Sequence, residues 1–285
     1  MSKPPLHPQL QTEGQPQTPG TVYLVGAGPG AADLLTLRAL KLLAQADVVF
    51  HDALIDPAIL DYAPRAQRIA VGKRCGRHST AQRFINKQLI AAAARYPVVV
   101  RLKGGDPMLF GRAQEEIAAL DAAGVPYAVV PGITAALAAS AELGVSLTQR
   151  GVARNVVLTT PRVGVDEPAG EWAAGIDAGN TVVVYMGMGK APEVVEQLLA
   201  RGVTGHTPVV VIENATLPTR RETWCTVASL VAVAQQALTG PALIIIGRVL
   251  EQARTQAAEL DQAHGLGVLS SRVGTTRLAP IRKTR

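Results

Sequence analysis

Three segments of the sequence combine a short apolar run with a glycine turn, a pattern suited to binding a small molecule. Residues 98–107 read Val-Val-Val-Arg-Leu-Lys-Gly-Gly-Asp-Pro, and residues 22–30 and 128–134 have the same organisation. Glycine lets backbone N–H and C=O groups approach a ligand without an intervening Cβ. Open α/β sheets bind their ligands outside the carboxyl ends of the strands. The three segments therefore predict a ligand site at one edge of a parallel sheet.

Asp106 is the acidic residue of the Gly-Gly-Asp-Pro loop. Its carboxylate could accept hydrogen bonds from an amine or from ribose hydroxyls of a ligand. It could instead stabilise the turn by bonding to the backbone two residues on, a frequent use of aspartate in turns. We favour the ligand interpretation.

A dinucleotide site is an alternative for the first glycine turn. Residues 26–31 fit G-x-G-x-x-A, and Asp52 follows a second apolar run at about the position of a ribose-binding acid. Three features count against this alternative: Pro29 stiffens the turn, Asp52 stands in a loop that leads to Pro57, and the glycines at 104–105 have no place in such a site. The five histidines and two cysteines are scattered without ligand spacing, so we expect no metal site.

Positive charge is concentrated in the first half of the chain. The net charge is +6, and residues 62–114 contain eleven Lys or Arg against one acid, Asp106. This segment could be a solvated basic face, or it could attract a polyanion such as a small molecule with several carboxylates. Nucleic acid is the weaker candidate, because no recognition-module signature accompanies the charge.

The composition predicts a large α/β protein. Of the 285 residues 48% are apolar and only 4% aromatic, so the core must consist mainly of Ala, Val, Leu and Ile, as in sheets covered by helices on both faces. Apolar runs and periodicity predict strands at 21–25, 48–50, 68–71, 98–102, 127–130, 156–159, 181–185, 208–212 and 242–246. They predict helices at 33–46, 57–62, 81–95, 115–123, 134–142, 192–200 and 229–237.

These elements suggest two α/β domains flanked by less regular segments. We expect a flexible leader at 1–19, an N-terminal α/β domain at 20–133, a C-terminal α/β domain at 134–250 and a disordered tail at 251–285. The leader lacks the apolar stretch of a secretory signal, and no apolar run is long enough for a membrane span. With so few cysteines, a cytoplasmic location is the expectation.

The sequence resembles the tetrapyrrole methylase family, and within it the uroporphyrinogen-III C-methyltransferases. The motifs that carry the resemblance are residues 25–30 with 35–40, 46–49 with Asp52, 71–79, 99–107 with 110–112, 130–135 and 185–187. They occur in order between about residues 21 and 250.

The resemblance implies an architecture, a cofactor and a reaction. The fold would be two α/β domains of the tetrapyrrole methylase type, with S-adenosylmethionine held in the cleft between them and a homodimer as the usual assembly. The reaction would add two methyl groups to uroporphyrinogen III and give precorrin-2, the branch point to sirohaem, cobalamin and haem d1. This small-molecule substrate carries many carboxylates, in keeping with the basic segment, so neither nucleic acid nor membrane is expected as a partner.

The resemblance also implies roles for individual residues. The cofactor-binding residues would be Pro29, Gly104, Gly105, Asp106, Leu109, Thr134, Ala135, Met186 and Ala215. Asp52 would be the proton acceptor and Lys73 the proton donor. Arg112, Glu115 and Arg150 would bind the substrate.

Several positions depart from the usual family pattern. Ala53 stands where the family has Arg, Pro161 where it has His, and Met108 where it has an aromatic residue, while Gln149 and Ala215 replace His and Gly. Two alternatives follow from these departures. The chain could methylate a different tetrapyrrole or corrinoid intermediate, or it could bind its ligands as a non-catalytic regulator.

Overall fold

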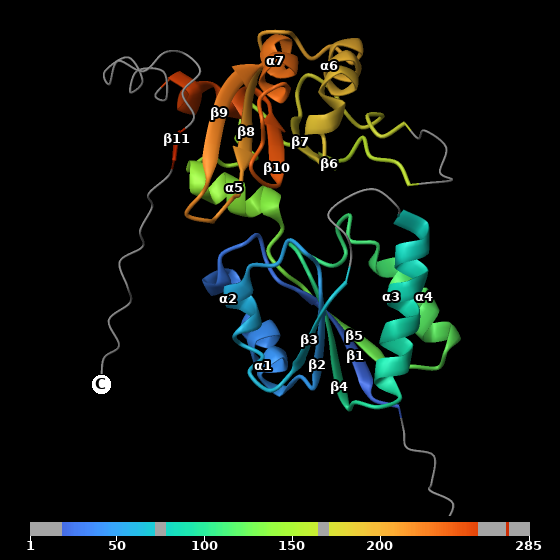
Figure 1. Cartoon of the computed structure of the whole chain (residues 1–285). Coiled ribbons are helices and arrows are strands. Elements are labelled where there is room, and N and C mark those ends of the chain that lie inside the picture. The colour runs from blue at the N-terminus through green and yellow to red at the C-terminus, as the bar shows by residue number, and fades with distance from the viewer. Residues whose placement is uncertain (1–18, 72–77, 165–170, 256–271, 274–285) are drawn as a thin grey trace, which may run out of the picture.

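The first part of the chain forms a parallel sheet between two layers of helices. The computed structural model describes residues 19–71, 78–164, 171–255 and 272–273 (Figure 1). Its first sheet has the order β3-β2-β4-β1-β5, and every adjacent pair is parallel. The strands are β1 (Thr21–Gly26), β2 (Val48–His51), β3 (Gln67–Ala70), β4 (Val98–Lys103) and β5 (Tyr127–Val130).

The helices cover the two faces of this sheet in pairs. Helices α1 (Leu37–Gln45) and α2 (Pro57–Leu60) lie on one side, and α3 (His78–Ala93) and α4 (Ala113–Ala122) lie on the other (Figure 1). Val99 packs in the core beneath α3 and α4, whereas the next residue, Val100, packs beneath α1 and α2. Because successive side chains of a strand face opposite sides, a sheet buried on both faces needs the continuous apolar runs seen in the sequence.

The second sheet is mixed. Its order is β11-β9-β8-β10-β7-β6; β6 pairs with β7 in parallel, and the other described pairs are antiparallel. Its strands are β6 (Val156–Thr159), β7 (Thr181–Tyr185), β8 (Pro208–Glu213), β9 (Arg221–Thr226), β10 (Ala242–Ile246) and β11 (Arg272–Val273). Helices α6 (Ala191–Ala200) and α7 (Leu230–Ala234) pack on one face, and α5 (Ala135–Leu143) packs on the other. Short 3-10 helices occur at η1 (Ala32–Leu34), η2 (Met188–Lys190), η3 (Val227–Ser229) and η4 (Arg248–Leu250).

The expected pair of α/β domains is confirmed, and the structure adds details that the sequence did not reveal. Strand β9 was not predicted, because its segment Arg-Glu-Thr-Trp-Cys-Thr contains no apolar run; Glu222 and Thr223 are nevertheless buried. The helix expected from residue 33 begins only at Leu37, because Thr36 is extended and its side chain accepts a hydrogen bond from Ala39 N at 3.2 Å. This is an ordinary N-cap.

Part of the segment expected as a tail belongs to the fold. Residues 251–255 continue helically after η4, and Arg272–Val273 pairs with β9. The rest of this segment, like the leader at 1–18, lies outside the described residues. None of the described helices has the length and apolar character that crossing a bilayer requires.

Three glycines bring the carboxyl ends of β1, β4 and β5 together backbone to backbone. A Cβ placed on Gly132 would lie 2.2 Å from the carbonyl oxygen of Gly105 and 2.8 Å from Cα of Gly26. Gly28 and Gly105 exchange two backbone hydrogen bonds, of 3.2 and 2.7 Å, and both have a positive φ. These glycines therefore allow the three loops to pack backbone against backbone. This packing determines which other backbone groups of the loops are exposed.

We predict that Gly132→Ala lowers the free energy of unfolding by about 2 kcal/mol or more, because the added methyl overlaps backbone atoms that cannot move independently. Urea unfolding measures this. Gly175→Ala is the matched control, since a methyl there meets no atom within 4 Å, and its stability should stay within about 0.5 kcal/mol of wild type. Equal stabilities of the two variants would refute the close contact of the loops.

Candidate active site

The loops at the carboxyl ends of β1 and β5 are hydrogen-bonded to strand ends of the second sheet. Ala31 N, after β1, donates a hydrogen bond to Thr216 Oγ1, after β8, at 2.9 Å. The Thr134 hydroxyl, after β5, lies 2.6 Å from the hydroxyl oxygen of Tyr185 at the end of β7. The strand ends of the first sheet are thus joined to strand ends of the second.

Several residues of these loops have strained backbone conformations. Five non-glycine residues have φ between 49 and 68°: Phe110, Arg112, Met186, Asn214 and Thr216. They lie in the loops that follow β4, β7 and β8. Left-handed conformations of such residues cost about 1 kcal/mol or more each and cluster at functional sites. Their position supports a site where the two sheets meet.

The carboxylate of Asp106 is bonded to two loops of its own domain. Oδ1 accepts a hydrogen bond from Met108 N at 2.8 Å, and Oδ2 accepts one from Gly132 N at 2.9 Å. The first is the turn interaction considered from the sequence, and the second ties the loop after β4 to the end of β5. Asp106 is half-buried, and each carboxylate oxygen can accept a further bond. It can therefore hold the loop and still bind a ligand donor.

Gly104 differs from the packed glycines. It is exposed, its φ is not in the left-handed range, and a Cβ there would meet no atom within 4 Å. No protein contact within the described residues thus demands glycine at this position. The backbone beside Asp106 is open to a ligand.

The remaining residues expected to bind a cofactor lie in the same group of loops. Pro29 precedes Gly30, whose Cβ position is 3.1 Å from the carbonyl oxygen of Ala215 in the second domain. Thr134 and Ala135 begin α5 beside Tyr185, the neighbour of the exposed Met186. Leu109 follows Asp106 and is half-buried. The structure therefore brings these residues to one region.

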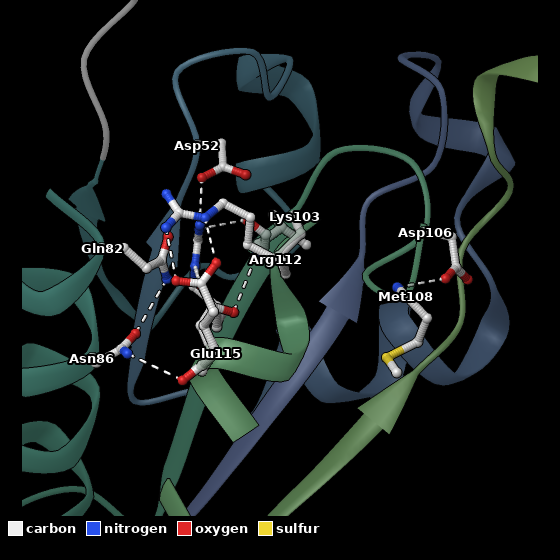
Figure 2. Close-up of polar contacts among 11 residues, drawn as sticks. Asp52, Gln82, Asn86, Lys103, Asp106, Met108, Arg112 and Glu115 are labelled. Carbon is white, nitrogen blue, oxygen red and sulfur yellow. Dashed lines mark hydrogen bonds and ion pairs between the residues drawn. The ribbon is translucent and has the colours of Figure 1, made fainter. Parts of the chain in front are cut away.

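A buried ion network lies beneath the loop after β2. Glu116 is fully buried, and its two carboxylate oxygens bind Arg101 Nε at 3.1 Å and Lys103 Nζ at 3.0 Å. Gln82 Nε2 donates to the same carboxylate at 3.1 Å. Arg101 reaches Asp52 with its other end, NH2 to Oδ1, at 2.5 Å. Figure 2 shows Asp52, Gln82 and Lys103 around this network, with Asp106 apart in the next loop.

Burial and charge pairing act on the two cations in opposite ways. Burial alone lowers the pKa of Arg101, but its ion pairs with Asp52 and Glu116 outweigh that effect and raise the pKa above its ordinary value. Burial and the neighbouring Arg101 hold the pKa of Lys103 below its ordinary value, although Glu116 opposes this shift. Arg101 is therefore a permanent cation that fixes Asp52, whose side chain stays 35% exposed.

This network corrects one interpretation of the sequence. Arg101 and Lys103 belong to the basic segment that could attract a polyanion, but both are only 3% exposed and paired with acids. The charge partner of Asp52 is Arg101, which is 49 residues away in the sequence. The surface charge of the segment must come from its other bases.

The residues expected to bind substrate lie in two separate parts of the fold. Arg112 and Glu115 form a two-pronged ion pair, with Nε to Oε1 at 2.6 Å and NH2 to Oε2 at 2.7 Å, and both are partly exposed (Figure 2). Arg150 is exposed in the turn between α5 and β6. Lys73, the expected proton donor, lies outside the described residues.

Glu116 could have been noticed from the helix pattern. The buried residues of α4 are Ala113, Glu116, Ile117 and Leu120, the i, i+3, i+4, i+7 spacing of a core-facing stripe. An acid on such a stripe requires a buried partner. What the pattern could not provide is the identity of that partner, because Arg101 and Lys103 lie on a different element.

Comparison with known sequences gives consistent matches over most of the chain. The family described as Tetrapyrrole (Corrin/Porphyrin) Methylases matches residues 21–231. Siroheme synthase 1 of Yersinia enterocolitica is 46% identical over 244 residues, which cover 85% of this chain and 52% of that protein. The siroheme synthase of Zymomonas mobilis is also 46% identical, over 86% of this chain and 51% of its own length. The chain thus spans about half the length of these curated relatives.

Solved structures resemble most of the chain. Uroporphyrin III C-methyl transferase from Thermus thermophilus, in its native form, has a TM-score of 0.70 and 36% identity, covering 82% of this chain and 94% of that one. The same Thermus enzyme complexed with S-adenyl homocysteine has a TM-score of 0.69, 37% identity and the same coverage. A cobalt precorrin-4 methyltransferase has a TM-score of 0.70 at 28% identity, over 81% of this chain and 95% of its own.

We predict that Glu116→Gln lowers the free energy of unfolding by about 3 kcal/mol, because it leaves two buried cations with one carboxylate fewer. Urea unfolding of Glu115→Gln, the neighbouring exposed acid, provides the control; a surface ion pair of this kind contributes about 0–1 kcal/mol. A Glu116 variant as stable as the Glu115 variant would contradict the buried network.

Proposed function

The chain belongs to the tetrapyrrole methylase family, and we propose that it is an S-adenosylmethionine-dependent C-methyltransferase acting on uroporphyrinogen III. The proposed reaction transfers two methyl groups to ring carbons of the macrocycle and gives precorrin-2 and S-adenosylhomocysteine. The observation that carries the proposal is the similarity to the Thermus enzyme complexed with S-adenyl homocysteine, which extends over 94% of that chain. The product would feed sirohaem, cobalamin or haem d1 formation.

We place the cofactor where the loops of the two sheets meet. The residues that would hold it are Pro29, Gly104, Gly105, Asp106, Leu109, Thr134, Ala135, Met186 and Ala215. The open backbone at Gly104 and the remaining acceptor capacity of Asp106 support this placement. In this proposal the packed glycines shape the loops, and Gly104 leaves the space that the cofactor fills.

The proposed reaction requires the methyl donor and the ring carbon to be aligned, and then requires a base that removes a proton. A methyl group moves from a sulfonium to a carbon in line, so holding both partners in the right geometry supplies most of the rate. Attack by a ring carbon is followed by loss of a proton, which a positioned base accelerates. We propose Asp52 as the proton acceptor, since it is partly exposed and held by Arg101, and Lys73 as the proton donor.

The substrate side would be built from arginines. A guanidinium can bind a carboxylate through two parallel hydrogen bonds. We propose that Glu115 orients Arg112 until a substrate carboxylate shares its donors, and that Arg150 binds another carboxylate of the macrocycle. The ion pair of Arg112 with Glu115 keeps the guanidinium ordered before the substrate arrives.

A second substrate is possible within the same reaction class. The cobalt precorrin-4 methyltransferase has the same TM-score as the native Thermus enzyme, although its identity is lower, at 28% against 36%. Methylation of a later corrinoid intermediate is therefore the runner-up proposal. The departures at Ala53, Met108 and Pro161 would then reflect the different substrate.

The proposed assembly follows from the family resemblance, and the proposed location from the small number of cysteines. We propose a homodimer, which light scattering coupled to size-exclusion chromatography measures. We also propose a cytoplasmic location, which cell fractionation tests.

We predict that purified protein incubated anaerobically with uroporphyrinogen III and S-adenosylmethionine yields a product carrying two added methyl groups, with two S-adenosylhomocysteine molecules per product. Mass spectrometry measures both. No methylation of uroporphyrinogen III together with methylation of a corrinoid would favour the second substrate. Cofactor binding without any turnover would favour a regulator.

The variant that tests the cofactor placement in this assay is Gly104→Val, and Gly175→Val is its matched control. A Cβ at Gly104 meets no atom of a non-neighbouring residue within 4 Å, and the same holds at the exposed Gly175, so the two valine variants should have similar melting temperatures. Gly104→Val should, however, abolish most turnover by occupying the cofactor position. Full activity of Gly104→Val would contradict the placement of the cofactor beside this loop.

A further inference from the structure

Tyr185 connects the second sheet to the beginning of α5. It is the last residue of β7, and its hydroxyl oxygen accepts a hydrogen bond from Ala136 N at 3.0 Å. The same oxygen lies 2.6 Å from Thr134 Oγ1, close enough for a strong hydrogen bond. One phenolic group thus binds two of the first three positions of the α5 N-terminus.

The hydroxyl of Tyr185 performs the task of a helix cap. The first N–H groups of a helix have no acceptor within the helix and are usually satisfied by the side chain of the N-cap residue. Thr134 is the N-cap of α5, but its side chain does not bond to its own helix and turns to Tyr185 instead. Ala136 is fully buried, so its N–H depends on the tyrosine oxygen for a partner.

The ring of Tyr185 contacts the first domain. Its centroid lies 5.0 Å from that of Phe110, at an interplanar angle of 54°, a favourable tilted arrangement. Phe110 is in the loop after β4, four residues beyond Asp106, and has a left-handed backbone conformation. Burial raises the pKa of the Tyr185 hydroxyl above its ordinary value, so the group is a neutral hydroxyl at neutral pH.

We infer that Tyr185 is a positioning residue of the cofactor site, an inference that rests on the cofactor placement proposed above. It joins three of the segments that would hold S-adenosylmethionine: the loop of residues 104–109 through Phe110, Thr134 and Ala135 through its hydroxyl, and Met186 through the peptide bond. Its effect on the cofactor is transmitted through the start of α5.

Removing the hydroxyl leaves the ring in place and frees the start of α5. In Tyr185→Phe the contact with Phe110 remains, while Ala136 N–H and the Thr134 hydroxyl lose their shared partner. The first turn of α5 then loses its polar link to the end of β7 and is held relative to Met186 by apolar packing alone. We expect the affinity for S-adenosylhomocysteine to fall about tenfold, which corresponds to about 1.4 kcal/mol, the net value of a typical hydrogen bond.

The test compares Tyr185→Phe with Tyr96→Phe. Tyr96 also donates a hydrogen bond, to Gln67 Oε1 at 3.2 Å, but it precedes the amino end of β4 and lies away from the loops of the site. Titration calorimetry with S-adenosylhomocysteine should give a tenfold weaker dissociation constant for Tyr185→Phe and a wild-type value for Tyr96→Phe. In turnover, the KM for S-adenosylmethionine should rise while the KM for uroporphyrinogen III stays unchanged. A purely structural role would lower the melting temperature and leave both constants alone.

A double-mutant cycle with Thr134→Val identifies the contact responsible. Because the two hydroxyls bond to each other, the effects of Tyr185→Phe and Thr134→Val on affinity should be less than additive. If Tyr185→Phe does not fold, Thr134→Ser, which keeps the hydroxyl, should bind several-fold more tightly than Thr134→Val.

The outcomes separate this inference from the proposed function. Wild-type protein that binds no S-adenosylhomocysteine overturns the proposed function and the inference with it. Wild-type binding that Tyr185→Phe leaves unchanged, or equal affinities of Thr134→Ser and Thr134→Val where Tyr185→Phe does not fold, overturns the inference alone. Additive effects in the cycle also overturn it.

Discussion

The contact between the backbones of Gly26, Gly105 and Gly132 determines where the other parts of the site can lie. With no Cβ between them, the ends of β1, β5 and the loop after β4 approach more closely than side chains would allow. Asp106 secures this arrangement by accepting a hydrogen bond from Gly132 N. The neighbouring Gly104 is exposed, and the loops at the ends of β1 and β5 reach Thr216 and Tyr185 of the second domain.

A second constraint is the electrostatic pairing of buried charges inside the first domain. Glu116 is buried with two cations, and such a carboxylate is tolerated only when it is paired and hydrogen-bonded. Besides its bond to Glu116, the Arg101 guanidinium forms an ion pair with Asp52, which is the partly exposed member of the network. The position of the proposed proton acceptor thus depends on a core residue of α4 that it does not contact directly.

Local sequence patterns predicted most of the fold. The apolar runs of β1, β4 and β10 and the helical stripe of α6 are long and regular, so their types followed from periodicity. Strand β9 was not predicted from the sequence because Glu222 and Thr223 are polar, and buried polar residues do not contribute to an apolar pattern. Its place in the sheet is decided by pairing with β8, which is tertiary information.

The site was predictable in part for a similar reason. Glycine turns after strands marked the loops, but their contacts with one another arise only when distant strands become neighbours. The pair of Asp52 with Arg101 spans 49 residues and joins β4 to the loop after β2. The capping of α5 by Tyr185 likewise spans 49 residues and joins the end of β7 to a helix that packs on the same sheet. Neither partner can be chosen from spacing along the chain, because it depends on strand order.

The central claim is that one ligand site is formed jointly by the strand ends of both domains. Amide hydrogen exchange with and without S-adenosylhomocysteine tests it most directly, because it reports each loop separately. We predict that the ligand slows exchange together in the loop at 104–110 of the first sheet, in the connection at 132–137 between β5 and α5, and at 186–188 and 214–217 of the second domain. Protection confined to the loops of a single domain would contradict the claim.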